Sequence, residues 1–368
     1  MNPDPEHDMG AVLERKLGLF PSTSIVVANM IGAGIFTTSG LLMGDLGDPV
    51  LMLILWVVGG CLALFGALSY GELGAHMPEA GGEYAFLSRL YHPMFGFLSG
   101  WVSLFAGFSA PIAASALGFS EYIFRVFPGI NPAGAAGILI GVAALKKILA
   151  ISVIVLFTAI HVQGIEFGAR IQNYLTVLKV GLIGALIVIG FTIGRGDFGH
   201  IAIRGDFNFN LAGWKTIGLS LLWIMFAYSG WNAATYIGSE VRDPRRNLPV
   251  SLLLGTAVVM ALYLCINLFY LFAIPAGEMK GVISVGGLAV TKSLGESAGS
   301  LFSLMIAFAL FSSLSAFVIL GPRVYYAMAQ DGCFFRFASK IHPDHKVPAG
   351  AIILQGNSVG HDGSFRHF

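Results

Sequence analysis

The stretch NMIGAGIFTTSG, residues 29–40, lies inside a long apolar run and interrupts it with glycine. Gly32 and Gly34 are only two residues apart, and each glycine in a helix costs roughly 1 kcal/mol relative to alanine. The stretch therefore predicts a break in the first apolar helix. Such a break either binds a ligand or lets another helix pack closely, as small residues often do in membrane proteins.

The composition indicates a membrane protein. Of the 368 residues, 56% are hydrophobic and 11% are charged, whereas a soluble domain carries about 25% charged residues. Several apolar runs are as long as the roughly 20 residues that a spanning helix requires. We therefore expect an all-α polytopic membrane protein that contacts the lipid bilayer. The expected spans lie near residues 20–44, 49–74, 93–127, 135–163, 171–194, 214–240, 247–274 and 298–330.

Other kinds of function find little support. The net charge of +1 gives no reason to expect a nucleic-acid partner. The three cysteines are scattered, and His342 and His345 in HPDHK have no further ligand motif beside them. GESAG, residues 295–299, matches a hydrolase nucleophile pattern but is expected in a loop before an apolar helix. We expect no metal, no cofactor and no enzymatic activity.

A second break is expected in the sixth run, LLWIMFAYSGWNAATYIGSE (221–240), at Ser229–Gly230. Breaks at corresponding positions in two halves are typical of transporters built from inverted repeats. In hydrocarbon, an unwound segment persists only where it lines a cavity or is buried in protein. Freed amides at a half-helix N-terminus attract an anion, and freed carbonyls at a C-terminus attract a cation. Two facing breaks therefore predict a site for a zwitterion such as an amino acid.

Three segments resemble the amino acid–polyamine–organocation superfamily of permeases: MIGAGIF (30–36), MPEAGGEYAFL (77–87) and FAYSGWNAATYIGSEVRDPRRNLP (226–249). The likeness is greatest to the bacterial and L-type amino acid exchangers and covers roughly residues 15–356. The resemblance implies a five-plus-five inverted-repeat fold with broken helices 1 and 6. It also implies a secondary transporter of amino acids, in which spans 1, 2, 6 and 7 rock against a scaffold that includes spans 3 and 8.

The same resemblance implies the binding residues. Backbone amides in the first break would bind the α-carboxylate, and backbone carbonyls in both breaks would hold the α-amino group. Phe226 would close over the substrate as a gate. The amides are those of Gly32, Ala33 and Gly34, and the carbonyls are those of Ile31, Phe226, Ala227 and Ser229.

Lys179 lies in the fifth run, about nine residues or 12–14 Å from the expected start at residue 171. A lysine at that depth is costly and indicates a function. The alternative is an inert lysine that faces water or a lipid headgroup. Similar permeases carry a lysine here, against the first span, where sodium-coupled relatives bind a cation. The resemblance implies either a fixed charge that serves sodium-independent exchange or an amine that titrates during proton symport.

Two weaker signals lie in the second half of the chain. Glu240 and the three arginines that follow it are expected to form a solvated cytoplasmic cluster after the sixth run, where ion pairs are worth little. The hydroxyls of Ser312, Ser313 and Ser315 in the eighth run either line the cavity or bond back to their own helix.

The loops predict orientation and boundaries. EVRDPRRNLP (240–249) is rich in arginine, whereas GDLGDP (44–49) has no lysine or arginine, so the N-terminus is expected in the cytoplasm. The expected location is the plasma (inner) membrane, and the sequence does not indicate a partner subunit. The expected parts are a cytoplasmic tail (1–18), a first five-helix repeat (19–194), an extracellular loop (195–213), an incomplete second repeat (214–356) and a non-native or frameshifted tail (357–368).

The last apolar run, VPAGAIILQG (347–356), begins like a ninth span and stops. The expectation is therefore about eight spans and the start of a ninth, from a C-terminally truncated permease. Two alternatives to a transporter follow. One is a non-transporting fragment of such a permease, and the other is an intramembrane enzyme or receptor. The latter would need polar clusters at membrane depth, where only Lys179 stands out.

Overall fold

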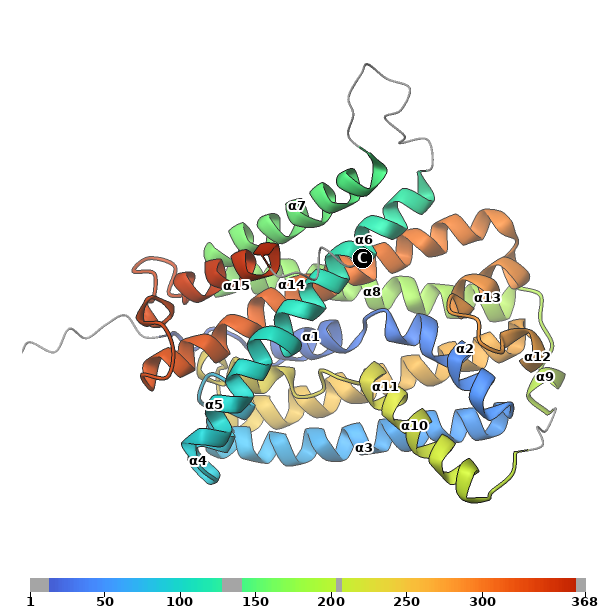
Figure 1. Cartoon of the computed structure of the whole chain (residues 1–368), viewed down its shortest axis with the longest axis horizontal. Coiled ribbons are helices and arrows are strands. Elements are labelled where there is room, and N and C mark those ends of the chain that lie inside the picture. Colours follow the sequence, from blue (N-terminus) through green and yellow to red (C-terminus); the bar gives the residue numbers. More distant parts are fainter. Residues whose placement is uncertain (1–12, 128–140, 203–206, 362–368) are drawn as a thin grey trace, which may run out of the picture.

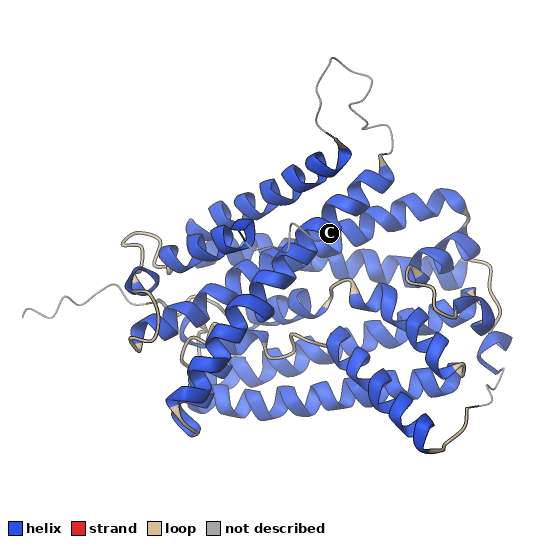
Figure 2. Ribbon diagram, viewed as in Figure 1, coloured by secondary structure: helices blue, strands red, loops and turns tan. Residues whose placement is uncertain are grey.

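The computed structural model describes residues 13–127, 141–202 and 207–361. Within these residues every regular element is a helix, and pairing between extended segments is limited to two isolated bridges. Figures 1 and 2 show these helices packed side by side, with long helices running the length of the molecule. The predicted all-α architecture is confirmed.

The first apolar run is two helices that meet end to end at a bend of 41°. In the first half of the chain the described helices are α1 (Leu19–Met30), α2 (Gly34–Leu46), α3 (Pro49–His76), α4 (Glu83–Leu90), α5 (Pro93–Val102), the π-helical η1 (Ser103–Ser109), α6 (Ala110–Val126), α7 (Val142–Val162) and α8 (Ile165–Thr192). In the second half they are α9 (Gly199–Ala202), α10 (Leu211–Ala227), the 3₁₀ turns η3 (Ala233–Tyr236) and η4 (Gly238–Glu240), α11 (Pro244–Ala273), α12 (Ala276–Met279), α13 (Val285–Leu294), α14 (Glu296–Gln330), η5 (Arg336–Ser339) and α15 (Ala349–His361).

Each of the eight predicted runs contains helix, but the runs are not equally long. Among the described residues, six helices are long and apolar enough to cross a membrane, and α1 with α2 makes a seventh span if the bent pair is counted as one. The helix of the sixth run, α10, has only 17 residues because the chain unwinds after Ala227. The short helices α4, α12 and α13 were not predicted, because none has the length of a membrane span.

Local sequence signals explain several helix starts. Asp48 precedes Pro49, and its carboxylate accepts a hydrogen bond from the Leu51 amide at 2.8 Å. Asn210 begins α10 in the same way, accepting from the Gly213 amide at 2.9 Å. Both are N-caps, which satisfy backbone donors that the first turn of a helix leaves free. Proline tolerates the first helical position because its missing N–H would have no partner there.

The helix α14 is the centre of the packing. It is buried along most of its apolar length, whereas little of the apolar stretch of α7 is buried. It packs against α6, α8, α13 and α15, and Figure 1 shows it crossing the length of the helical body. The helix α1 packs against α8, α11 and α14. The first break therefore lies beside α14, the most buried of the described helices that are long enough to cross a membrane.

Both ends of the described chain attach to this body. Leu17 forms a bridge with Val241, and the amides of Lys16 and Leu17 both donate to the Glu240 carbonyl at 2.9 Å. Residues 1–12 of the predicted cytoplasmic tail lie outside the described residues. At the other end, residues 357–361 of the predicted non-native tail continue α15, and residues 362–368 lie outside the described part. The predicted domain boundaries stay predictions.

Candidate functional site: two broken helices

The first break separates α1 from α2 where the sequence predicts it. The helix α1 ends at Met30, Ile31 is extended with φ −80° and ψ 93°, and α2 begins at Gly34. No side chain caps the start of α2. A helix N-terminus without a side-chain cap presents backbone N–H groups that suit an anion. Gly32 and Gly34 are partly exposed and Ala33 is exposed, so these amides lie near an accessible surface.

The second break follows α10, which ends at Ala227, and Gly230 then turns the chain with φ +102°. This backbone conformation is open to glycine but strained for residues with a Cβ. Close packing adds a second requirement, because a Cβ on Gly230 would lie 2.5 Å from the side-chain nitrogen of Asn29. The break predicted at Ser229–Gly230 is therefore present.

The two breaks contact each other. A Cβ on Gly34 would lie 3.1 Å from both Cα and Cβ of Ala227, so the first residue of α2 packs against the last residue of α10. The contact between Gly230 and Asn29 joins the same two segments from the other side. The structure thus brings together two stretches almost two hundred residues apart in the chain. Here the C-terminal ends of α1 and α10 converge beside the N-terminal end of α2.

Lys179 is buried and reaches the first break. Its Nζ donates to the carbonyls of Ala28 at 3.1 Å and Ile31 at 2.9 Å, and to the hydroxyl of Ser313 at 3.0 Å. The side chain is only 1% exposed. These contacts do not fit the alternative that Lys179 faces water or a lipid headgroup. Because α8 begins at Ile165, Lys179 lies 14 residues, or about 21 Å, along the helix, farther from the helix start than the sequence predicted.

Ser313 links α14 to the same carbonyls. Its hydroxyl lies 2.7 Å from the Ile31 oxygen, 3.2 Å from the Ala28 oxygen and 3.0 Å from the Ala309 oxygen of its own helix. Of the two alternatives predicted for this serine, the bond back to its own helix is observed. A position that lines the substrate cavity stays a prediction. The Ile31 oxygen has Lys179 and Ser313 as neighbours, and a carbonyl has two lone pairs. A substrate amine bound to the Ile31 carbonyl would compete with Lys179 or Ser313 for that oxygen. The predicted role of Ile31 in binding the substrate amine stays a prediction.

The predicted carbonyl and gate residues of the sixth run differ in exposure. Ala227 is buried, Ser229 is exposed, and the Phe226 side chain is 69% exposed. In this conformation Phe226 does not cover the break, and its function as a gate stays a prediction. The Phe226 carbonyl accepts the Ser229 amide at 3.1 Å.

A carboxylate from a neighbouring loop helix contacts the unwound sixth segment. The Asn232 side chain donates to Glu83, the first residue of α4, and lies 3.3 Å from the Tyr236 hydroxyl. Burial raises the pKa of the Glu83 carboxyl, and hydrogen bonds with Tyr236 and Asn232 partly offset that rise. Glu83 lies within the segment MPEAGGEYAFL (77–87), and the sequence predicts no function for it. Its position in a loop gave no signal of burial.

One prediction about this region is wrong. Glu240 does not lie in a solvated cluster with the arginines that follow it. It is fully buried, and its two carboxylate oxygens accept from Nε and Nη2 of Arg323 at 2.8 and 3.0 Å. The reason is that η4 turns Glu240 inward onto α14, while Arg242, Arg245 and Arg246 stay exposed. The sequence shows that Glu240 and Arg323 are charged, but hydropathy does not indicate that two residues 83 positions apart form an ion pair.

Tyr263 is a site residue that the sequence prediction missed. Its hydroxyl donates toward the Met30 carbonyl at 2.8 Å and the Ala227 carbonyl at 3.1 Å. A signal was available in the run MALYLCINLFYLF, where Tyr263, Asn267 and Tyr270 recur at helical spacing. Polar side chains on one face of an apolar helix indicate a face turned toward protein.

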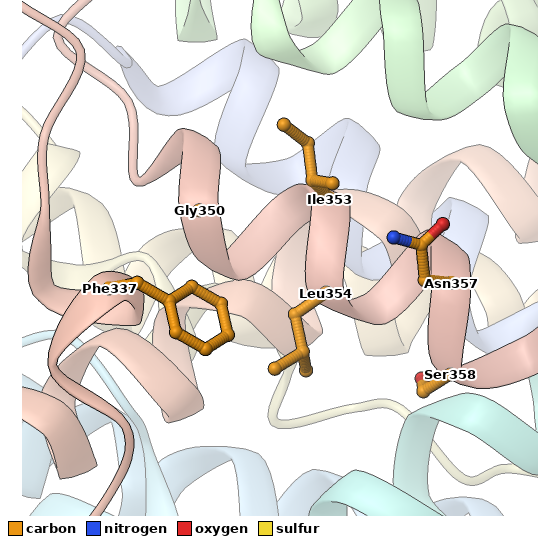
Figure 3. Close-up of a pocket in the computed structure, with 6 residues that line it drawn as sticks. All are labelled: Phe337, Gly350, Ile353, Leu354, Asn357 and Ser358. Carbon is orange, nitrogen blue, oxygen red and sulfur yellow. The ribbon is translucent and has the colours of Figure 1, made fainter.

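A surface hollow near the end of the described chain lies away from both breaks. It measures about 510 Å³ and lies between η5 and α15, lined by Phe337, Gly350, Ile353, Leu354, Asn357 and Ser358 (Figure 3). None of these residues belongs to either break, and most of the lining is apolar. An amino acid head group carries two charges and needs polar partners. The hollow is therefore not the zwitterion site.

The amino acid permease family matches residues 17–359, which include both breaks and Lys179. The chain belongs to this family. The resemblance to amino acid–polyamine–organocation permeases is thereby confirmed, and so is the interpretation as a multi-pass membrane protein of a permease family rather than an enzyme family.

Characterised relatives extend over most of the chain. The serine/threonine exchanger SteT of Bacillus subtilis is 30% identical over 354 residues, covering 93% of this chain and 75% of the relative. The Asc-type amino acid transporter 1 of Mus musculus is 28% identical over 353 residues. The large neutral amino acids transporter small subunit 2 of Homo sapiens is 27% identical over 348 residues. The chain spans 63% of the length of each of the latter two relatives.

Proposed function

We propose that the protein is a secondary transporter that moves amino acids across the membrane by alternating access, as an exchanger or a proton-coupled permease. The observation that carries this proposal is the contact between the two breaks, Gly34 against Ala227. This crossing offers both helix-terminal amides and helix-terminal carbonyls to one small molecule, as the discontinuous helices of transporters do. The names of the relatives, which are amino acid exchangers and transporters, support the same substrate class.

The proposed head-group site uses backbone atoms. The amides of Gly32, Ala33 and Gly34 receive the α-carboxylate at the uncapped start of α2. Carbonyls at the ends of α1 and α10 attract the α-amino group, because helix C-termini carry partial negative charge. Phe226, exposed in this conformation, then moves over the bound substrate as a gate. Backbone contacts recognise the head group that all amino acids share, so the side-chain preference depends on other residues.

Lys179 is proposed to occupy the place of a coupling cation. Its ammonium group is bound by the Ala28 and Ile31 carbonyls and the Ser313 hydroxyl, which are oxygen ligands of the kind that also suit a sodium ion. A permanent charge there supports sodium-independent exchange. An amine that releases its proton during the cycle supports proton symport instead. Both modes depend on the contact between Lys179 and the first break.

We place the protein in the plasma membrane, or inner membrane of a bacterium, with its N-terminus in the cytoplasm. The segment at Leu17 pairs with Val241, next to the exposed Arg242, whose amide donates to the Leu17 carbonyl at 2.7 Å. The N-terminal segment and the arginine-rich loop therefore lie at the same end of the molecule. Basic loops favour the cytoplasmic side.

Counterflow tests the proposed function. The purified chain is reconstituted into liposomes loaded with unlabelled amino acids, and entry of a labelled mixture is followed without sodium. We expect labelled amino acids to accumulate transiently above equilibrium. A pH gradient across the same liposomes distinguishes the two modes, because only a proton symporter accumulates substrate in response to it. Absence of both signals from folded wild-type protein contradicts the proposal.

Two variants connect the assay to the site. Phe226→Ala should slow exchange, whereas Phe65→Ala, which alters a phenylalanine of α3 that is 63% exposed, should leave it unchanged. Lys179→Met keeps much of the side-chain volume but leaves the Ala28 and Ile31 carbonyls without their charged donor. It should abolish exchange while the protein still folds. Full exchange by Lys179→Met would exclude a coupling role for this residue.

A further inference from the structure

A loop fits tightly against the unwound sixth segment, close to the arginine-rich loop. We call residues 79–83 the closing loop. The Gly81 amide donates to the Tyr236 carbonyl at 3.1 Å. A Cβ on Gly82 would lie only 2.6 Å from the Tyr236 ring, so the loop approaches this closely because it carries no side chain there. The closing loop therefore packs directly on residues 232–240.

Glu83 is the last residue of the closing loop and the first residue of α4. Its carboxylate accepts hydrogen bonds from the Asn232 side-chain nitrogen and from the Tyr236 hydroxyl. The helix α4 packs against α5 and α14, which lie in the third and eighth spans, the scaffold of the proposed mechanism. Asn232 lies in the sixth span, which that mechanism moves. The contact between Glu83 and Asn232 therefore crosses from the scaffold to the moving helices.

No cation balances this carboxylate within the described residues. Glu83 forms no ion pair there, and both of its hydrogen-bond partners are neutral. The charged groups of the surrounding elements have other partners, and the remaining titratable groups are a tyrosine that interacts with Glu83 and an exposed histidine before α5. These groups are Arg323 of α14 with Glu240, Arg89 of α4 with Glu79 and Asp331, Tyr84 of α4 with Asp331, Tyr70 of α3, and His92.

Such surroundings favour the protonated acid. Removing a carboxylate from water is costly when no opposite charge compensates for the lost hydration. Glu83 is partly buried, and burial raises the pKa of its carboxyl by more than the hydrogen bonds from Asn232 and Tyr236 lower it. If the closing loop separated from the sixth segment, water would reach the group and its pKa would return toward the ordinary value. Proton binding and closure at this end of the molecule therefore favour each other.

We infer that Glu83 is a proton-binding site, occupied while the closing loop lies against the unwound sixth segment and emptied when the two separate. On separation the O–H bond of the acid breaks, a water molecule takes the proton, and the carboxylate remains. The inference rests on the proposed function for its effect on transport, because alternating access requires this end to open. The proton site itself needs only the fold. Acid holds this end closed, and a higher pH lets it open.

The test compares Glu83→Gln with Glu79→Gln and the wild type in the purified full chain. Glutamine at position 83 keeps the size and hydrogen bonding of the protonated acid but does not titrate. Glu79 is the matched control, because it lies in the same loop but is 49% exposed and pairs with Arg89. Amide hydrogen exchange of residues 80–84 and 232–240 without substrate reports on separation. The infrared band of a carboxylic-acid carbonyl reports on the bound proton.

In the wild type, exchange in both segments, divided by that of Glu83→Gln at the same pH, should rise by up to about tenfold per pH unit above the ordinary carboxyl pKa. The rise should end where the closed form also loses its proton. Glu79→Gln should follow the wild type, and Glu83→Gln should lack one carboxylic-acid band. Tyr236→Phe removes a donor that favours the ionised form, so its rise should continue to a higher pH. A merely structural effect would change the rates by a factor that does not depend on pH.

The outcomes are separable. If wild-type protein transports no amino acid, the proposed function fails, and exchange and infrared spectra still decide whether Glu83 binds a proton. A constant ratio of wild-type to Glu83→Gln exchange at all pH values overturns the inference, and so does a carboxylic-acid band that persists in Glu83→Gln. If Glu83→Gln does not fold, the pH at which the wild-type band disappears decides instead, and the same pH in Tyr236→Phe overturns the inference.

Discussion

The buried ion pair between Arg323 and Glu240 gives a quantitative prediction. Two charge-assisted hydrogen bonds of 2.8 and 3.0 Å join the side chains, and a third runs from Arg323 Nη1 to the Ile319 carbonyl at 2.7 Å. The side chains are 1% and 0% exposed. Removing one partner of such a pair leaves a buried charge without compensation, which typically costs about 3–5 kcal/mol. Arg323→Met should lower the free energy of unfolding by about that amount.

The double variant Glu240→Leu/Arg323→Met should recover most of the loss. Replacing a buried pair by apolar residues of similar volume is often neutral or stabilising by about 1–4 kcal/mol, because both desolvation costs disappear. Unfolding in mixed micelles with increasing SDS, followed by loss of helical signal, measures each free energy. The four proteins form a double-mutant cycle, whose coupling energy should be about 3 kcal/mol or more.

An exposed ion pair supplies the control. Arg89 contacts Glu79 and Asp331 at 3.4 and 3.3 Å, but its side chain is 49% exposed. Arg89→Met should cost less than about 1 kcal/mol, since water screens such pairs. The reasoning is refuted if Arg323→Met costs no more than Arg89→Met. It is also refuted if the effects of Glu240→Leu and Arg323→Met simply add.

Three further predictions concern the breaks. Gly34→Leu should abolish amino acid binding, because even a Cβ there lies 3.1 Å from Ala227. The control Gly218→Leu in α10, with open space around it, should bind amino acids normally. Radioligand binding measures both variants. Ser313→Ala should weaken exchange more than tenfold in counterflow, since Lys179 and the Ile31 carbonyl both lose a partner. The raised pKa of Glu83 means that the folded protein binds the proton more tightly than the unfolded chain. Stability should therefore fall as pH rises from about 4.5 through the folded-state pKa, and melting curves of Glu83→Gln should show a flatter pH dependence.

Local sequence patterns predicted those features that depend on residues close together in the chain, namely the apolar spans and the helix breaks. Apolar runs indicated the spans because a bilayer requires about 20 apolar residues in succession. Glycine pairs indicated the breaks, and the structure ends α1 at Met30 and α10 at Ala227, within a few residues of the predicted positions. Hydropathy placed Lys179 within a spanning helix, but α8 begins at Ile165, six residues before the predicted start at 171, so Lys179 lies farther along the helix than predicted.

The boundaries were less predictable where packing sets them. Hydropathy did not indicate that α4, α12 and α13 would be helices, because they are short and no bilayer requirement applies to them. The amide of Gly281, between α12 and α13, donates to the Gly40 carbonyl in α2 at 2.9 Å. That contact joins the two halves of the chain and forms only when the helices pack, so local sequence patterns do not predict it.

The amino-acid sequence was enough to predict membrane-spanning helices, a break in two of them, and the motifs of amino acid permeases. Which buried polar groups contact one another is known from the packed helices alone. Glu240 forms an ion pair with Arg323, and Lys179 donates to a carbonyl just after α1. The Tyr263 hydroxyl lies within hydrogen-bond distance of the last carbonyls of α1 and α10. Helix propensity and hydropathy act over a few turns of one helix, whereas a buried donor and its acceptor are matched across helices that are distant in the chain. That matching exists only once the helices have packed.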